Sequence, residues 1–209
     1  MNIRTMILVG LAAFSLAGNA LAEDSRELNR IAKIYSSGDV EKAVPELKSY
    51  LSAHADDTLA WTILGHASKD AGQLAEAEKA YKEAIRLNPK RVEAMTGMGM
   101  LARVTKDYDE AMRWYEQAIK IDPKFGQAYS SIVTLALKKS DFKKAVSMGE
   151  KGYQLDSTDP VIAANLAIAY HYNKQIDARD RMTKTAARLG YGKLDVLQKI
   201  YAGELDVRD

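Results

Sequence analysis

The 209-residue chain contains no cysteine, only four prolines and only three histidines. The absence of cysteine excludes disulfide bonds, thiolate metal ligands and a thiol nucleophile, so the fold must be held together by packed apolar area. The scarcity of proline removes the residue that most strongly interrupts helices. A large share of alanine, leucine, lysine and glutamate favours helix throughout, and the composition therefore predicts an all-α protein.

Neither sign of charge is in excess. Lysine and arginine together number 30, against 28 aspartates and glutamates. This balance provides no electrostatic reason to expect a nucleic acid or an anionic membrane as a partner. After the N-terminus there is no apolar run of spanning length, so we expect no transmembrane segment in the mature chain.

Side chains that could form a catalytic or metal site are scattered. Such sites need converging ligands or a nucleophile beside a base. None of His54, His66 and His171 has another histidine or a paired carboxylate at ligand spacing on the same helix face. A methionine group at residues 95, 98, 100 and 112 could hold a soft metal, but its spacing fits core packing better. We therefore predict no catalytic residue, no metal, no cofactor and no enzymatic activity.

The N-terminus has the pattern of a secretory signal peptide. Arg4 forms a positive start, an apolar run follows over residues 7–17, and small residues surround a cleavage point after Ala22. An uncleaved anchor is the alternative, but it would need roughly twenty apolar residues to cross a bilayer. We predict that residues 1–22 are removed and that the mature chain is periplasmic or secreted.

A 34-residue repeat accounts for almost all of the remaining chain. One unit contains Trp61, Leu64-Gly65, Ala77, Tyr81, Ala84 and Pro89, and the positions 34 residues later hold Met95, Met98-Gly99, Ala111, Tyr115, Ala118 and Pro123. The register continues without insertion through five units, at about residues 24–57, 58–91, 92–125, 126–159 and 160–193.

Each unit has the pattern of two amphipathic helices. Apolar residues recur three and four positions apart within each half, which defines one buried stripe per helix. Small residues such as Gly65 and Ala77 would let the two helices approach closely, and Tyr81 would fill the space between neighbouring hairpins. Turns are expected at residues 38–39, 72–73, 106–107 and 140–141. The sequence thus predicts five antiparallel helical hairpins.

These columns of small and large residues resemble the tetratricopeptide repeat (TPR) family over roughly residues 24–193. The resemblance implies an α-solenoid, a right-handed superhelix of hairpins over residues 23–193. Several residues depart from the pattern, among them the following three. Pro45 lies inside a helix that it should kink or shorten, Gly149 occupies a column of bulky residues, and Arg179 occupies a column of small ones.

Residues 194–209 follow the last repeat. Leu194, Leu197, Ile200 and Tyr201 share one helical face before Gly203, so we predict a capping helix over residues 193–202 that covers the last hydrophobic edge. We expect the tail from Glu204 to Asp209 to be frayed.

The resemblance also implies a binding surface, because the first helix of each TPR hairpin lines a concave groove that takes an extended peptide or a partner helix. The family's groove positions fall here on Thr62, His66, Lys69, Thr96, Met100, Arg103, Ser130, Thr134, Lys138, Ile168, His171 and Tyr172. Lys69, Arg103 and Lys138 would form a basic row that favours an acidic partner, although ordinary solvation of helix faces explains the same residues. The family's chaperone-tail clamp is absent, because Leu28 and Ala32 stand where it needs lysine and asparagine.

We interpret the chain as a non-enzymatic adaptor in the bacterial periplasm that binds a protein or peptide segment in the groove. Export and fold together suggest, by analogy, an envelope secretion, pilus or outer-membrane assembly. A self-associating structural protein that forms a homo-oligomer is the alternative. A binder of small molecules would need a closed pocket, of which the sequence gives no sign.

Overall fold

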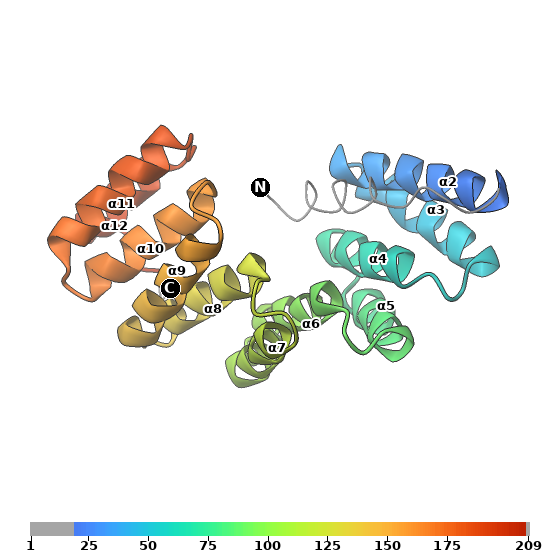
Figure 1. The fold of residues 1–209 in the computed structure, drawn as a ribbon, viewed down its shortest axis with the longest axis horizontal. Helices are drawn as coiled ribbons and strands as arrows, with labels where there is room; N and C mark the ends of the chain where they lie inside the picture. Colours follow the sequence, from blue (N-terminus) through green and yellow to red (C-terminus); the bar gives the residue numbers. More distant parts are fainter. Residues whose placement is uncertain (1–18, 208–209) are drawn as a thin grey trace. The chain divides into compact units, whose positions relative to one another are not determined.

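The computed structural model describes residues 19–207 of the chain. Residues 1–18, which hold most of the predicted signal peptide, and residues 208–209 lie outside the described part. Between residues 19 and 207 every regular element is an α-helix, from α2 (Asn19–Ser36) to α12 (Leu194–Tyr201) (Figure 1). The all-α prediction is confirmed. No helix in this range is both long and apolar enough to cross a membrane.

Two kinds of helix alternate at fixed intervals. After α2, the first helices of the hairpins are α4 (Thr58–Asp70), α6 (Val92–Val104), α8 (Gly126–Lys138) and α10 (Pro160–Tyr172). The second helices are α3 (Val40–Ala53), α5 (Leu74–Leu87), α7 (Tyr108–Ile121), α9 (Phe142–Leu155) and α11 (Ile176–Arg188). From α4 onward each first helix begins 34 residues after the one before, and so does each second helix from α3 onward.

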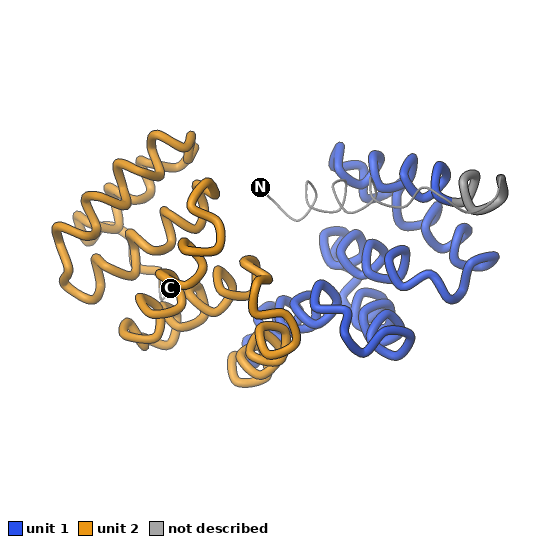
Figure 2. The backbone as a smooth tube through the Cα atoms, viewed as in Figure 1, with its two compact units in different colours: residues 1–107 blue, residues 108–209 orange. Residues whose placement is uncertain are grey.

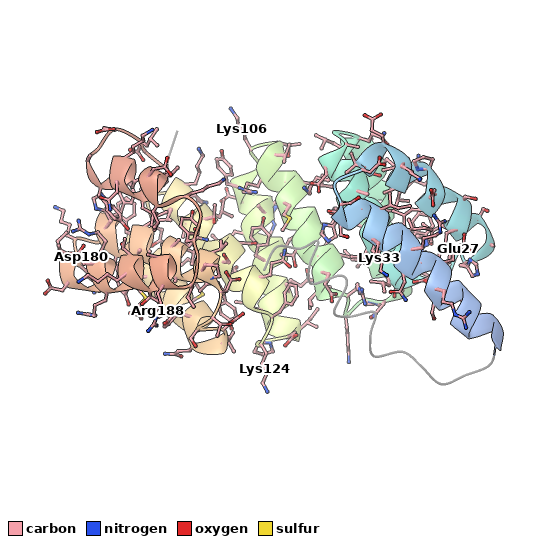
Figure 3. The ribbon with its side chains drawn as sticks, turned by 90° about the horizontal axis from the view of Figure 1, so that it is seen from above. Glu27, Lys33, Lys106, Lys124, Asp180 and Arg188 are labelled. Carbon is pink, nitrogen blue, oxygen red and sulfur yellow. The ribbon has the colours of Figure 1, made fainter. Side chains whose placement is uncertain are left out.

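The turn inside each hairpin uses the same left-handed backbone position. Its occupants are Gly38, Gly72, Lys106, Ser140 and Lys174, with φ between 59° and 97°. After α4, Gly72 donates its N–H to the Lys69 carbonyl at 3.0 Å. The next residue donates to the Ser68 carbonyl at 2.8 Å, which satisfies the free carbonyls at the helix end. The four predicted turns are therefore confirmed. Lys106 lies at its turn with the side chain directed away from the helices (Figure 3).

The helices group into two compact units that divide between residues 107 and 108 (Figure 2). In the described part of the chain, the first unit holds α2 to α6 and the second holds α7 to α12. Each has a core of its own: Ile31, Leu47 and Ile63 belong to the first, and Val133 and Ala163 to the second. Burial of these stripes, rather than intrinsic helix propensity, is what keeps helices of 13 or 14 residues folded.

The prediction that Pro45 shortens its helix is wrong. Helix α3 has 14 residues, the same length as α5, which contains no proline. The side chain of Asp39 caps its first turn by accepting the Lys42 N–H at 3.1 Å. Five of its apolar side chains are buried, and this packing outweighs the one backbone donor that the proline removes.

Tyr81 of α5 fills a space that two glycines leave open. Its ring is fully buried in the first unit. A Cβ atom added to Gly65 of α4 or to Gly97 of α6 would lie less than 3.0 Å from this ring, closer than real Cβ atoms come. The predicted roles of Gly65, as the point of close approach, and of Tyr81, as the residue that fills the space, are both confirmed.

In the second unit, the departures from the repeat pattern have structural reasons. A Cβ on Gly149 of α9 would lie 2.8 Å from a methyl carbon of Leu166 in α10, so the missing side chain lets these helices approach. The guanidinium carbon of Arg179 lies 4.9 Å from the ring centre of Tyr201 in α12. Arg179 therefore supports the predicted capping helix, whose Leu197 and Ile200 are buried.

The tail after α12 is not frayed up to residue 207, contrary to our expectation. Gly203 adopts the left-handed conformation, with φ of 76°, and the next residue donates its N–H to the Lys199 carbonyl at 2.8 Å. This helix end turns the chain back, and Val207 packs against the core of the second unit. Packed apolar area and hydrogen bonds hold the segment where sequence position alone suggested disorder.

Candidate functional site

In the first unit, three of the six predicted groove residues lie inside the packing. The exposed fractions of Thr62, His66 and Thr96 are 1%, 2% and 0%. The Thr62 hydroxyl donates to the carbonyl of Thr58 at 2.7 Å, and Thr96 makes the same bond to Val92 one turn back along its own helix. These three side chains therefore offer no donor or acceptor surface to a partner.

His66 has a structural partner. Its Nδ1 lies 2.7 Å from the hydroxyl of Tyr81, and the two rings meet edge to face with centroids 5.2 Å apart. Burial, and after it the nearby charge of Lys69, lowers the pKa of His66 from its ordinary value to about 3. The imidazole is therefore neutral at physiological pH, and it joins α4 to α5 rather than binding an anion.

The accessible part of this surface in the first unit is small and partly neutralised. Lys69 forms an ion pair with Asp70, and Asp70 also accepts a hydrogen bond from Tyr35 at 2.9 Å. Met100 is half-buried and Arg103 is exposed. Asp70 thus neutralises Lys69, one of the three residues of the predicted basic row. The row therefore attracts an acidic partner less strongly than the sequence suggests.

In the second unit, the predicted residues divide in the same way. The Ser130 hydroxyl accepts a hydrogen bond from the side-chain amide of Asn165 at 3.0 Å, which joins α8 to α10. Ile168 is 7% exposed and belongs to the core. Thr134 is exposed and Lys138 is half-buried. The hydroxyl of Thr134 donates to its own helix, and these two residues are part of the accessible surface of α8.

A cluster of rings lies at the C-terminal end of α10. Tyr172, its last residue, stacks on Phe142 of α9 with centroids 5.2 Å apart and an interplanar angle of 16°. His171 meets Tyr172 edge to face and lies 4.9 Å from the ring of Tyr201 in α12. Burial lowers the pKa of His171, and the charge of Arg179 lowers it further. We call Phe142, His171, Tyr172 and Tyr201 the aromatic cluster.

The tail lies directly on this cluster, which the sequence analysis missed. The hydroxyl of Tyr172 donates to a carboxylate oxygen of Asp206 at 3.1 Å and accepts the backbone N–H of Val207 at 3.3 Å. The available signals were Gly203, which is typical of a helix end, and an apolar residue in the tail. Neither indicates which side chain the tail meets.

The described residues bring together no group of three or more histidine, aspartate or glutamate side chains that could hold a metal ion. Met95 and Met98 are buried and Met112 is half-buried, as expected for core packing. The arrangement presents aromatic surface, hydroxyl groups and scattered charge, which can bind a peptide segment.

Comparison with known proteins supports the fold. Residues 64–124 match the model of the tetratricopeptide repeat family. Solved structures with this fold include PilF from Pseudomonas aeruginosa, with 15% sequence identity, 88% of this chain and 86% of that chain covered, and a TM-score of 0.73. They also include MamA from Desulfovibrio magneticus RS-1, with 17% identity, 88% and 99% covered, and a TM-score of 0.59.

YrrB, described as a TPR protein with an unusual peptide-binding site, shares 15% identity over 85% of this chain and 90% of its own, with a TM-score of 0.58. None of the curated proteins matches the sequence significantly. Residues 64–124 thus match the tetratricopeptide repeat family, and the chain has the helix spacing and the fold of a tetratricopeptide repeat solenoid. Proteins of this family are generally non-catalytic scaffolds that bind peptide or protein partners.

Proposed function

We propose that this chain is a non-enzymatic adaptor of the bacterial periplasm that binds a segment of a partner protein. The observation that carries the proposal is the aromatic cluster at the end of α10, where the Tyr172 hydroxyl already holds the chain's own residues 206–207. Aromatic residues in such positions supply much of the binding energy of protein interfaces. YrrB, with a similar fold and a peptide-binding site of its own, supports a peptide as the ligand.

The proposed location depends on the N-terminal signal. Cleavage after Ala22 would leave a mature chain that begins at Glu23. Mass spectrometry of the periplasmic fraction should detect this species. Recovery of the intact N-terminus from a membrane pellet would contradict both the location and a role in a periplasmic secretion, pilus or outer-membrane assembly.

Site-directed photocrosslinking in living cells tests the binding function. A photoreactive phenylalanine at position 134 of α8 should crosslink to a partner, because Thr134 is a predicted groove residue and its side chain is exposed. The matched control is the same amino acid at position 78, an exposed site on α5. Crosslinks from both positions to the same abundant proteins, or from neither, would contradict a specific binding surface.

Self-association is the second candidate, and exposed apolar side chains in the second unit favour it. Leu155, the last residue of α9, is 42% exposed, and Val161, at the start of α10, is 43% exposed. Light scattering of the mature chain should then give a dimer or larger species that Leu155→Ser with Val161→Ser converts to monomer. A wild-type monomer over the micromolar range would contradict this candidate.

A further inference from the structure

We propose that the surface around Tyr172 is a peptide-binding site that the chain's own tail occupies, and that its partner carries an acidic residue followed by an apolar one. The inference rests on the proposed function and specifies the chemistry of the partner. It follows from three features: the position of Tyr172, the contacts of the tail, and the way in which α12 ends.

The Tyr172 hydroxyl recognises two groups of one short segment. It donates to the Asp206 carboxylate at 3.1 Å and accepts the N–H of Val207 at 3.3 Å. A hydroxyl group can donate once and accept in addition, and both roles are used here. One of these bonds needs an acceptor, which the Asp206 carboxylate supplies with a negative charge that strengthens the bond, and the other needs the backbone N–H of the residue after it. This pair of contacts recognises an acidic residue that is followed by any residue other than proline.

The apolar part of the site favours an apolar side chain at the residue after the acidic one. Val207 packs against the core of the second unit, to which Phe142, Tyr172 and Tyr201 also pack. The Tyr172 ring is held in place by its stacking on Phe142. A preorganised ring at the end of a helix binds without losing much side-chain freedom, which favours a short ligand. The two residues that precede the contact, Glu204 and Leu205, are exposed, and Leu205 is 45% exposed.

The contacts of the tail with Tyr172 are ones that a partner segment can make in its place. Gly203 fixes the connection of the tail to α12, and beyond it the Tyr172 hydroxyl makes one hydrogen bond to Asp206 and one to Val207. A hydrogen bond of this kind adds only modestly to stability, because both groups bond to water when the segment is released. A partner segment with the same acidic–apolar chemistry and additional contacts along α8 or α10 would therefore displace the tail. Full occupancy of the site by a partner requires release of residues 206–207.

The test uses the full mature chain and a synthetic peptide with the sequence of residues 203–207, acetylated and amidated at its ends. Asp206→Ala with Val207→Ser releases the tail. Glu204→Ala with Leu205→Ser is the matched control, because it changes two exposed residues of the same tail. Binding is followed by NMR titration of isotopically labelled protein. A second peptide, with asparagine in place of the aspartate, tests recognition of the carboxylate.

We expect the peptide to bind the release variant about fivefold more tightly than the wild type or the control. The reason is that a tail tethered by a few residues competes at an effective concentration in the millimolar range. The asparagine peptide should bind the release variant more weakly, and Tyr172→Phe in the release background should abolish the difference between the two peptides. Equal binding by wild type and release variant, or equal binding of both peptides, would overturn the proposal.

Two further outcomes separate this proposal from the proposed function. A release variant that forms concentration-dependent dimers by light scattering, without binding the peptide, would show that a second copy is the occupant and overturn the partner chemistry. Failure of the peptide titration together with a crosslinked partner from position 134 would overturn the tail proposal and leave the adaptor function standing. The converse result, peptide binding without any crosslinked partner, would contradict the adaptor function alone.

Discussion

The hydroxyl of Tyr81 lies 2.7 Å from Nδ1 of His66 inside the first unit, where neither side chain reaches solvent. The same ring lies against Gly65 and Gly97. One tyrosine thus joins α4, α5 and α6 through a hydrogen bond and through close backbone approach. The two effects can be tested separately.

Gly65→Ala tests the close approach. The added methyl group would overlap the buried Tyr81 ring, which its hydrogen bond to His66 prevents from moving away. Overpacking of this kind costs about 1–3 kcal/mol, and it opposes a gain in helix propensity of about 0.5–1 kcal/mol. We expect a net loss in the free energy of unfolding, measured by urea denaturation. Gly192→Ala is the control, because a Cβ there meets no atom within 4 Å. A rise in stability for Gly65→Ala would contradict the packing described here.

His66 predicts a specific pH dependence. Its pKa is about 3 in the folded chain, against 6.5 for an exposed histidine, so between these values the unfolded chain binds a proton that the folded chain does not. The free energy of unfolding should therefore fall as pH decreases from 6.5, by about 1.4 kcal/mol for each pH unit. His171, whose pKa is also lowered, contributes in the same direction.

Denaturation at pH 6.5 and pH 5.0 measures this slope above the range where most carboxylates titrate. His66→Gln should remove most of it, since glutamine does not ionise and can still bond to Tyr81. An unchanged slope in that variant would show that His66 is not the titrating group.

The hairpin turn at Lys106 predicts a stabilising change. Its φ of 63° is a left-handed conformation that costs a side chain about 1–2 kcal/mol, and glycine avoids this cost while losing about 0.5–1 kcal/mol through its greater freedom in the unfolded chain. Lys106→Gly should therefore raise the free energy of unfolding by up to about 1 kcal/mol. Lys124→Gly, at an exposed turn residue without positive φ, should not stabilise the chain. Equal effects of the two changes would contradict the turn geometry.

The capping helix should contribute to the stability of the second unit. Leu197 is fully buried against the core there, so Leu197→Ala is expected to cost about 2–4 kcal/mol in the free energy of unfolding. Leu205→Ala, at a residue that is 45% exposed, provides the comparison and should change stability by less than about 0.5 kcal/mol. Similar melting temperatures for the two variants would mean that α12 does not cover the core.

The sequence predicted the helices well and the binding surface less well, for a physical reason. The positions of Gly65 and Tyr81 follow from the period, because packing between neighbouring repeats is what the period conserves. The exposed fractions of the Thr62 and Thr96 side chains depend on how much of each the neighbouring helix covers. The family's groove positions carry no information about this coverage.

The contact between Tyr172 and Asp206 could not be predicted, because it joins residues 34 apart that lie in different elements. The tail has no repeat partner, so the 34-residue period carries no information about it. The conformation of Gly203 and the contacts with Tyr172 set its direction, and the sequence indicates a helix end at Gly203 without indicating where the chain goes next.

The most direct test of the central claim is affinity capture from envelope extract, with the mature wild-type chain, Tyr172→Ala and Lys69→Ala as baits. We expect at least one protein whose recovery falls about fivefold or more with Tyr172→Ala, because that ring is the proposed anchor. With Lys69→Ala the recovery of this protein should fall less than about twofold. At high salt the recovery with Lys69→Ala should equal that with the wild type. Both variants should keep the wild-type helical circular dichroism. Undiminished recovery of the same protein by Tyr172→Ala would contradict the claim that the aromatic cluster is the binding site.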